Sequence, residues 1–144
     1  MDLRQALLTE IYARLTEDVA LQGICGGTVR LVEGMPTPDT AFPYLTHSFT
    51  LEAGDSWALA EGFWLLDLWD HSPNTIRLSA MRHRLITLMD KLVLTPPGGD
   101  IVLMQIDFVR ESKGPTDAPD VHRLMTQWSL HLDRQVEVVA VLGR

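Results

Sequence analysis

Residues 100–134 read DIVLMQIDFVRESKGPTDAPDVHRLMTQWSLHLDR and predict a long β-hairpin. Two runs rich in apolar and β-branched side chains, 100–113 and 121–134, flank a connection with one glycine, two prolines and two aspartates. This composition is typical of a turn between strands. We therefore expect two antiparallel strands joined by residues 114–120.

The register of this hairpin is predicted from its alternation. Antiparallel strands place directly opposed residues on the same face, and a slip of one residue exchanges the faces. The expected register collects the apolar side chains on one face by pairing Ile106 with Trp128 and Met104 with Leu130. The other face then carries polar side chains such as Gln105 and Ser129.

Two earlier segments complete the expected sheet, with a short strand candidate at 28–32. Residues 44–52 alternate between polar and apolar side chains, which predicts a strand with one apolar face. Residues 60–70 are apolar on both sides, through Phe63, Trp64, Leu65, Leu66, Leu68 and Trp69. Such a strand usually lies centrally and is covered twice. In so small a protein, we expect a neighbouring subunit to supply the second cover.

Two segments predict helices. Residues 2–17 repeat leucine or isoleucine every four positions, and 71–94 carry a broad apolar stripe behind Ser72 and Pro73, which suit a helix start. The predicted fold class is α+β, a mainly antiparallel sheet with two main helices packed on one face. Residues 1–134 form this single domain, and 135–144 form a C-terminal strand or arm.

Composition excludes several classes of function. The 144 residues have a formal net charge of −7, and lysines and arginines form no stripe, which disfavours nucleic-acid binding. No apolar run is long enough to span a membrane, and the start of the chain predicts a cytoplasmic product. The single cysteine, Cys25, permits no internal disulfide and is expected to be buried.

No motif in the sequence predicts catalysis, a cofactor or a metal. The strongest catalytic candidate is Asp70 beside His71, because a carboxylate next to an imidazole can tune a general base. These two residues also suit a strand-to-helix turn, and we favour that interpretation. His122 and His131 are nine residues apart on one expected strand, so they point to opposite faces and cannot share a metal within one chain.

A size argument predicts a partner. The strand 121–134 would span roughly 45 Å and the helix from about Pro73 to Leu94 roughly 33 Å. One end of the hairpin should therefore extend beyond the layer of helices. Apolar residues then continue beyond the expected sheet, as an ordinary closing strand or as an arm that docks on a neighbour. The interface candidates are Trp57, in a loop, and Val136, Val138, Val139 and Leu142.

The order and spacing of several features resemble a known family from about Leu3 to Asp133. They are an opening helix with Leu7, Ile11, Tyr12 and Leu15, a proline-rich loop closing in Phe42-Pro43-Tyr44, a loop with Trp57, a strand ending Leu68-Trp69-Asp70, a helix near Pro73, and Val121-His122-Arg123 after the last turn. In these features the chain resembles the phage tail-completion family, which includes tail terminators that join head to tail. Residues 135–144 are less typical of it.

The resemblance implies a non-enzymatic subunit without catalytic residues or cofactors. It implies a homo-oligomeric ring of six copies that caps the tail tube and gives the head connector, or stopper, a surface to join. The protein would then lie in the virion, and in the host cytoplasm during assembly. Two alternatives remain open: a small enzyme centred on Asp70 and His71, and a non-phage adaptor that binds a peptide by adding a strand to the sheet edge.

Overall fold

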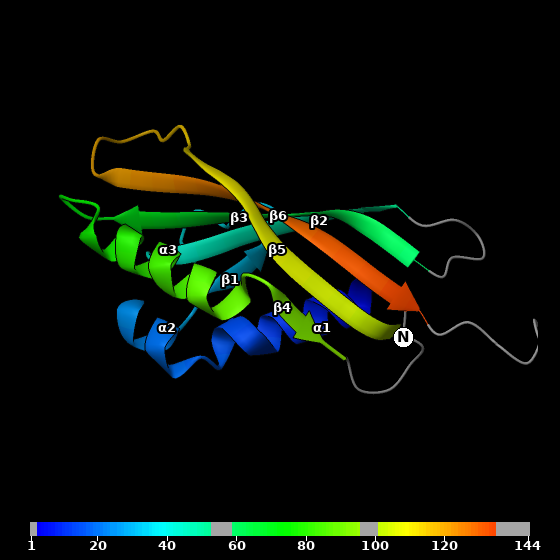
Figure 1. The fold of residues 1–144 in the computed structure, drawn as a ribbon. Helices are drawn as coiled ribbons and strands as arrows, with labels where there is room; N and C mark the ends of the chain where they lie inside the picture. The colour runs from blue at the N-terminus through cyan, green and yellow to red at the C-terminus, as the bar shows by residue number, and fades with distance from the viewer. Residues whose placement is uncertain (1–2, 53–58, 96–100, 135–144) are drawn as a thin grey trace, which may run out of the picture.

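The computed structural model describes residues 3–52, 59–95 and 101–134. It contains the helices α1 (Leu3–Thr16), α2 (Val19–Ile24) and α3 (Ile76–Met89). The strands are β1 (Leu31–Glu33), β2 (Tyr44–Glu52), β3 (Leu59–His71), β4 (Leu92–Leu94), β5 (Ile101–Lys113) and β6 (Val121–Arg134). Figure 1 shows how these helices and strands are arranged in space. Within these described ranges, no helix is long and apolar enough to cross a membrane.

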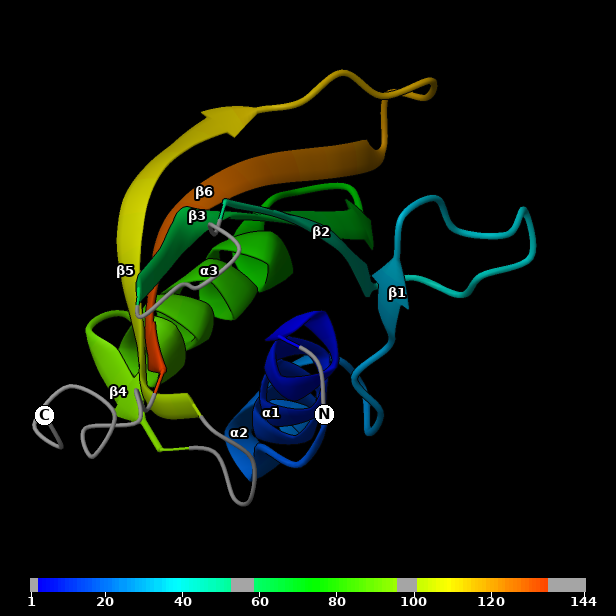
Figure 2. The same cartoon turned by 90° about the vertical axis from the view of Figure 1, so that its right-hand side faces the viewer.

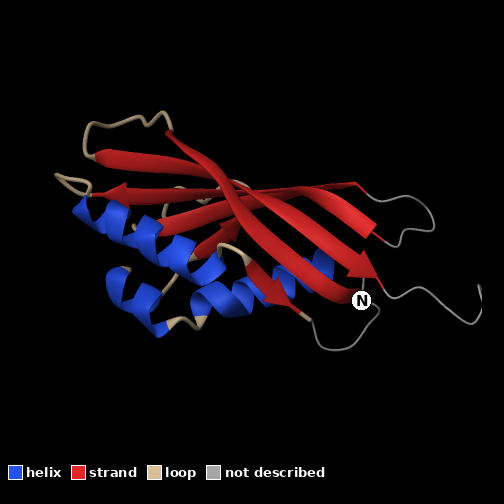
Figure 3. Ribbon diagram, in the orientation of Figure 1, coloured by secondary structure: helices blue, strands red, loops and turns tan. Residues whose placement is uncertain are grey.

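One six-stranded sheet organises the molecule, in the order β1-β2-β3-β6-β5-β4. β1 runs parallel to β2, and the other neighbours pair antiparallel. This confirms the predicted α+β class with a mostly antiparallel sheet. The described residues form three helices rather than two main ones. The sheet curls, and Figures 2 and 3 show the helices below its concave side.

The hairpin forms where the sequence predicts it, but with another register. Ile106 lies opposite Leu130 rather than Trp128, and Met104 opposite Leu132 rather than Leu130. The expected faces survive this two-residue shift because the side-chain period of a strand is two. A register irregularity between Phe108 and Arg110 then changes the parity toward the turn. Alternation within the strands gives no signal for such a bulge.

The helix boundaries differ from the prediction at both ends of α3. The helix begins at Ile76, whose N–H donates to Asn74 Oδ1 at 3.0 Å, so Ser72 is not the N-cap. It ends at Met89, and Lys91 takes a positive φ of 59°. The residues expected as its last turn form β4 instead, because Leu92–Leu94 pair with β5.

The core lies between the helices and one face of the sheet. α1 buries one stripe and α3 another, and the sheet adds alternate residues of its central strands. Trp64 of β3 and Trp128 of β6 are fully buried, with ring centroids 5.5 Å apart. The sequence predicts both tryptophans on apolar strand faces, and in the structure these faces are turned toward the core. A short helix that it did not predict, α2, begins where Asp18 Oδ2 accepts the Leu21 N–H.

Candidate functional site

The outer face of the sheet, opposite the helices, is apolar at its centre. Successive β3 residues alternate between the two faces. Trp64 and Leu66 are fully buried against the core, whereas Phe63 and Leu65 are 46% and 45% exposed on the outer face. Met125 of β6 adds a third exposed apolar side chain there, at 36%. Contiguous apolar surface on a small protein indicates an interaction site.

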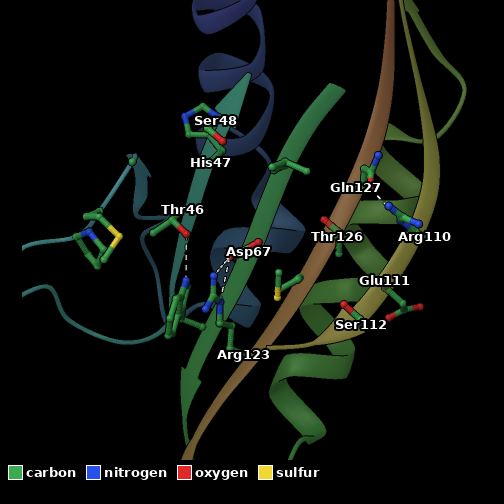
Figure 4. A pocket seen from close by; sticks show the side chains of 16 residues that line it. Thr46, His47, Ser48, Asp67, Arg110, Glu111, Ser112, Arg123, Thr126 and Gln127 are labelled. Carbon is green, nitrogen blue, oxygen red and sulfur yellow. Dashed lines mark hydrogen bonds and ion pairs between the residues drawn. The ribbon is translucent and has the colours of Figure 1, made fainter. Parts of the chain in front are cut away.

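A groove of about 580 Å³ runs over this face. Its lining comes from β2, β3, β6, the turn-proximal part of β5, and the loop after β1 (Figure 4). Leu65 and Met125 lie on its floor strands, and Met35, which is 87% exposed, belongs to the loop at one side. The groove therefore combines apolar side chains with a polar rim, as protein interaction sites commonly do.

One end of the groove is held by a polar network. Arg123 donates from Nη2 and Nε to Asp67 Oδ2, at 2.6 and 3.0 Å. Its guanidinium carbon lies 4.6 Å from the ring centroid of Trp69, whose Nε1 donates to Thr46 Oγ1 at 3.0 Å. These contacts fix the rotamers of the side chains, so this end is organised before any partner arrives.

On the opposite side of the groove, the guanidinium group of Arg110 contacts a neutral side chain. Arg110 Nε donates to the amide oxygen of Gln127 at 2.9 Å. Across the part of the chain that the structure describes, Arg110 takes part in no ion pair. Glu111 also lines the groove, but it binds Arg82 of α3 on the other face of the strand. Arg110 is thus available to a carboxylate from a partner.

The catalytic candidate from the sequence does not assemble. Asp70 is fully buried and accepts from Arg77 Nε at 2.9 Å, whereas His71 is exposed with its ring 5.7 Å from that of Phe42. Adjacent strand residues point to opposite faces, so this carboxylate does not orient this imidazole. Asp70 Oδ2 is buried without a hydrogen-bond partner among the described residues. The ion pair with Arg77 instead joins the end of β3 to α3.

Other candidate groups also have structural surroundings. Burial raises the pKa of the Cys25 thiol to about 11, so it stays protonated at neutral pH and is a poor nucleophile. His122 Nε2 donates to the backbone carbonyl oxygen of Ser72, 2.9 Å away, whereas His131 lies beside Asp133 on the outer face. The two histidines point to opposite faces, as expected. In the described ranges, no group of three His, Cys, Asp or Glu residues could hold a metal.

The interface candidates from the sequence, Trp57, Val136, Val138, Val139 and Leu142, all lie outside the described residues. The groove itself was not predicted. Its apolar floor was signalled by the two-sided apolar character of β3, but the contribution of Arg110 and Met35 depends on the curl of the sheet. Local sequence patterns do not encode that curl.

Comparisons with known proteins identify the fold. No protein-family model matches the chain. No curated protein matches it either. Among solved structures, a chain from the virion of a native gene transfer agent particle superposes with a TM-score of 0.72 at 16% identity, covering 91% of this chain and 97% of that one. A second solved chain, described without a function, gives a TM-score of 0.68 at 14% identity, covering 93% and 98%.

Proposed function

We propose that this protein is a structural subunit of a phage or phage-like particle, and specifically a tail terminator. The observation that supports it best is the shared fold with a chain of a gene transfer agent virion, over nearly the full length of both chains. The order of sequence features that resembles the tail-completion family points the same way. The role is non-catalytic and needs no cofactor.

The uncovered sheet face supports an assembled state. Exposed apolar side chains at the centre of a sheet stabilise a protein only when another surface covers them. Copies of this chain arranged as a six-membered ring would supply that cover. The ring would cap the tail tube, stop its growth, and present a surface to the head connector. The acidic net charge of −7 suits a ring that DNA passes without binding in a sequence-specific way.

Electron microscopy tests this proposal. We expect the purified protein to form rings of uniform diameter, and tail tubes assembled with it to carry one ring at one end. Tubes grown in its presence should have a defined maximum length, whereas tubes grown alone should continue to elongate. Rings that never bind tubes, or tubes that lengthen equally in both conditions, would contradict the terminator role.

A further inference from the structure

We propose that residues 135–144 of one copy dock in the outer-face groove of a neighbouring copy. This inference rests on the homo-oligomer in the proposed function and adds to it the segment and the surface that join two copies. The surface is the groove of about 580 Å³ over β3 and β6. The segment is the ten-residue sequence QVEVVAVLGR that follows β6.

The segment and the groove have matching chemistry. Five of the ten residues are large aliphatic side chains: Val136, Val138, Val139, Val141 and Leu142. The groove offers exposed apolar side chains from Met35, Leu65 and Met125. Burying an aliphatic side chain against such a surface favours binding and opposes the cost of ordering the segment.

The charges also match. Glu137 is the only acidic residue of the segment. Arg110, at the side of the groove, binds the neutral amide of Gln127 and takes part in no ion pair that the described residues show. A carboxylate between two valines would meet this guanidinium while the valines contact the apolar floor. Guanidinium–carboxylate pairs also fix the orientation of a bound segment.

The segment is too short to fill the groove of its own chain. On β6 the groove extends from Gln127 to Arg123, seven to eleven residues before Arg134, or roughly 23–36 Å at about 3.3 Å per residue. A segment that turns back at Arg134 would carry its residues 136–142 only about 7–26 Å along that path. Only Val141 and Leu142 would reach the near rim, and no residue up to Leu142 would reach the far end at Arg123. This limit on reach does not apply to the segment of a neighbouring copy, because that segment does not start from Arg134 of the same chain.

The oligomeric state of matched variants tests the proposal. Light scattering after size exclusion should give the full ring for the intact chain, and monomers for a chain lacking residues 135–144 and for Leu65→Glu. Each change should weaken association by at least roughly tenfold, because each removes apolar burial of one side chain or more. Val93→Glu is the control: Val93 is 54% exposed on the same sheet but does not line the groove, so the ring should persist.

Mixing distinguishes docking between copies from docking within one copy. The truncated chain keeps its groove, and Leu65→Glu keeps its C-terminal segment. Together they should form a one-to-one complex that grows no further, because only one of the two possible junctions can form. Met125→Glu replaces Leu65→Glu if the latter changes the circular dichroism spectrum. Absence of the one-to-one complex would overturn the proposal.

A charge exchange tests the register of docking. Arg110→Glu and Glu137→Arg should each weaken the ring, and the chain with both changes should regain it. A truncated chain that still forms the ring would overturn the docking proposal and leave the ring standing. An intact chain that stays monomeric at high concentration would instead contradict the proposed oligomer itself.

Discussion

Gly62 of β3 lies against the backbone of β2. A Cβ atom added at this position would meet the carbonyl group of Thr50 and the Cα of Leu51, which are backbone atoms that cannot rotate away. We therefore expect Gly62→Ala to destabilise the fold by about 1–3 kcal/mol, the usual range for overpacking. Thermal unfolding measures this effect. Gly23→Ala in α2 is the matched control, because a Cβ there has open space and should stabilise the helix by about 0.5–1 kcal/mol.

At the scale of single residues, we also expect the stability of the fold to depend on pH through Asp18. Hydrogen bonds from Arg84 to Asp18 lower the pKa of Asp18 below its ordinary value of 3.8, against the opposing effect of burial. A lowered folded-state pKa contributes stability that is fully present above about pH 4 and is lost as the pH falls through the folded-state pKa.

Arg84→Met should remove that contribution while leaving the N-cap bond from Asp18 to Leu21 in place. We expect the variant to be less stable than the intact protein at pH 6, and the difference to shrink as the pH falls below about 4. Denaturant unfolding across pH measures it. A difference that stays constant down to the acid limit would mean that the ion pair does not contribute through the ionisation of Asp18.

At the scale of elements, the sequence predicts strands better than their connections. β2 and β6 match their predicted ranges because alternation and turn composition mark both ends. The predicted helix at 71–94 is wrong at its C-terminal end, because Leu92–Leu94 fit an apolar helix stripe and a strand equally well. Pairing with β5, a tertiary contact, selects the strand. The hairpin register also differs from the prediction, because alternation fixes the faces of the strands but cannot distinguish registers that differ by two residues.

The junction between α3, β4 and β5 yields a prediction at this scale. Asp90 Oδ1 accepts the Phe108 N–H at 2.8 Å, on the edge of β5 beyond the short β4. Asp90→Ala leaves that donor without its acceptor, so we expect a loss of about 1–2 kcal/mol. Asp90→Asn keeps an acceptor oxygen and should lose less. Hydrogen exchange at the Phe108 amide measures the contact directly, and unchanged protection in Asp90→Ala would show that the bond is not formed.

At the scale of the whole molecule, the apolar side chains on one face of the sheet are covered, whereas those on the other face are partly exposed to solvent. The helices cover the concave side of the sheet, whereas Phe63 and Leu65 remain exposed on the other side. The sequence predicts this need for a second cover through the two-sided apolar character of residues 60–70. It does not predict where the groove lies, because its lining comes from four strands and a loop that only the folded sheet brings together.

If sister copies supply the second cover, stability and assembly are linked. A partner that binds only the folded chain raises its apparent stability with concentration, so the melting temperature should rise as the protein is concentrated. We expect this rise for the intact chain and for Val93→Glu, and a constant melting temperature for Leu65→Glu, whose folded monomer keeps the same core. Scanning calorimetry over a hundredfold range of concentration measures it. If the melting temperature of the intact chain does not change with concentration, the outer face of the sheet is stable while exposed to solvent. Copies of the chain would then not cover one another's outer face.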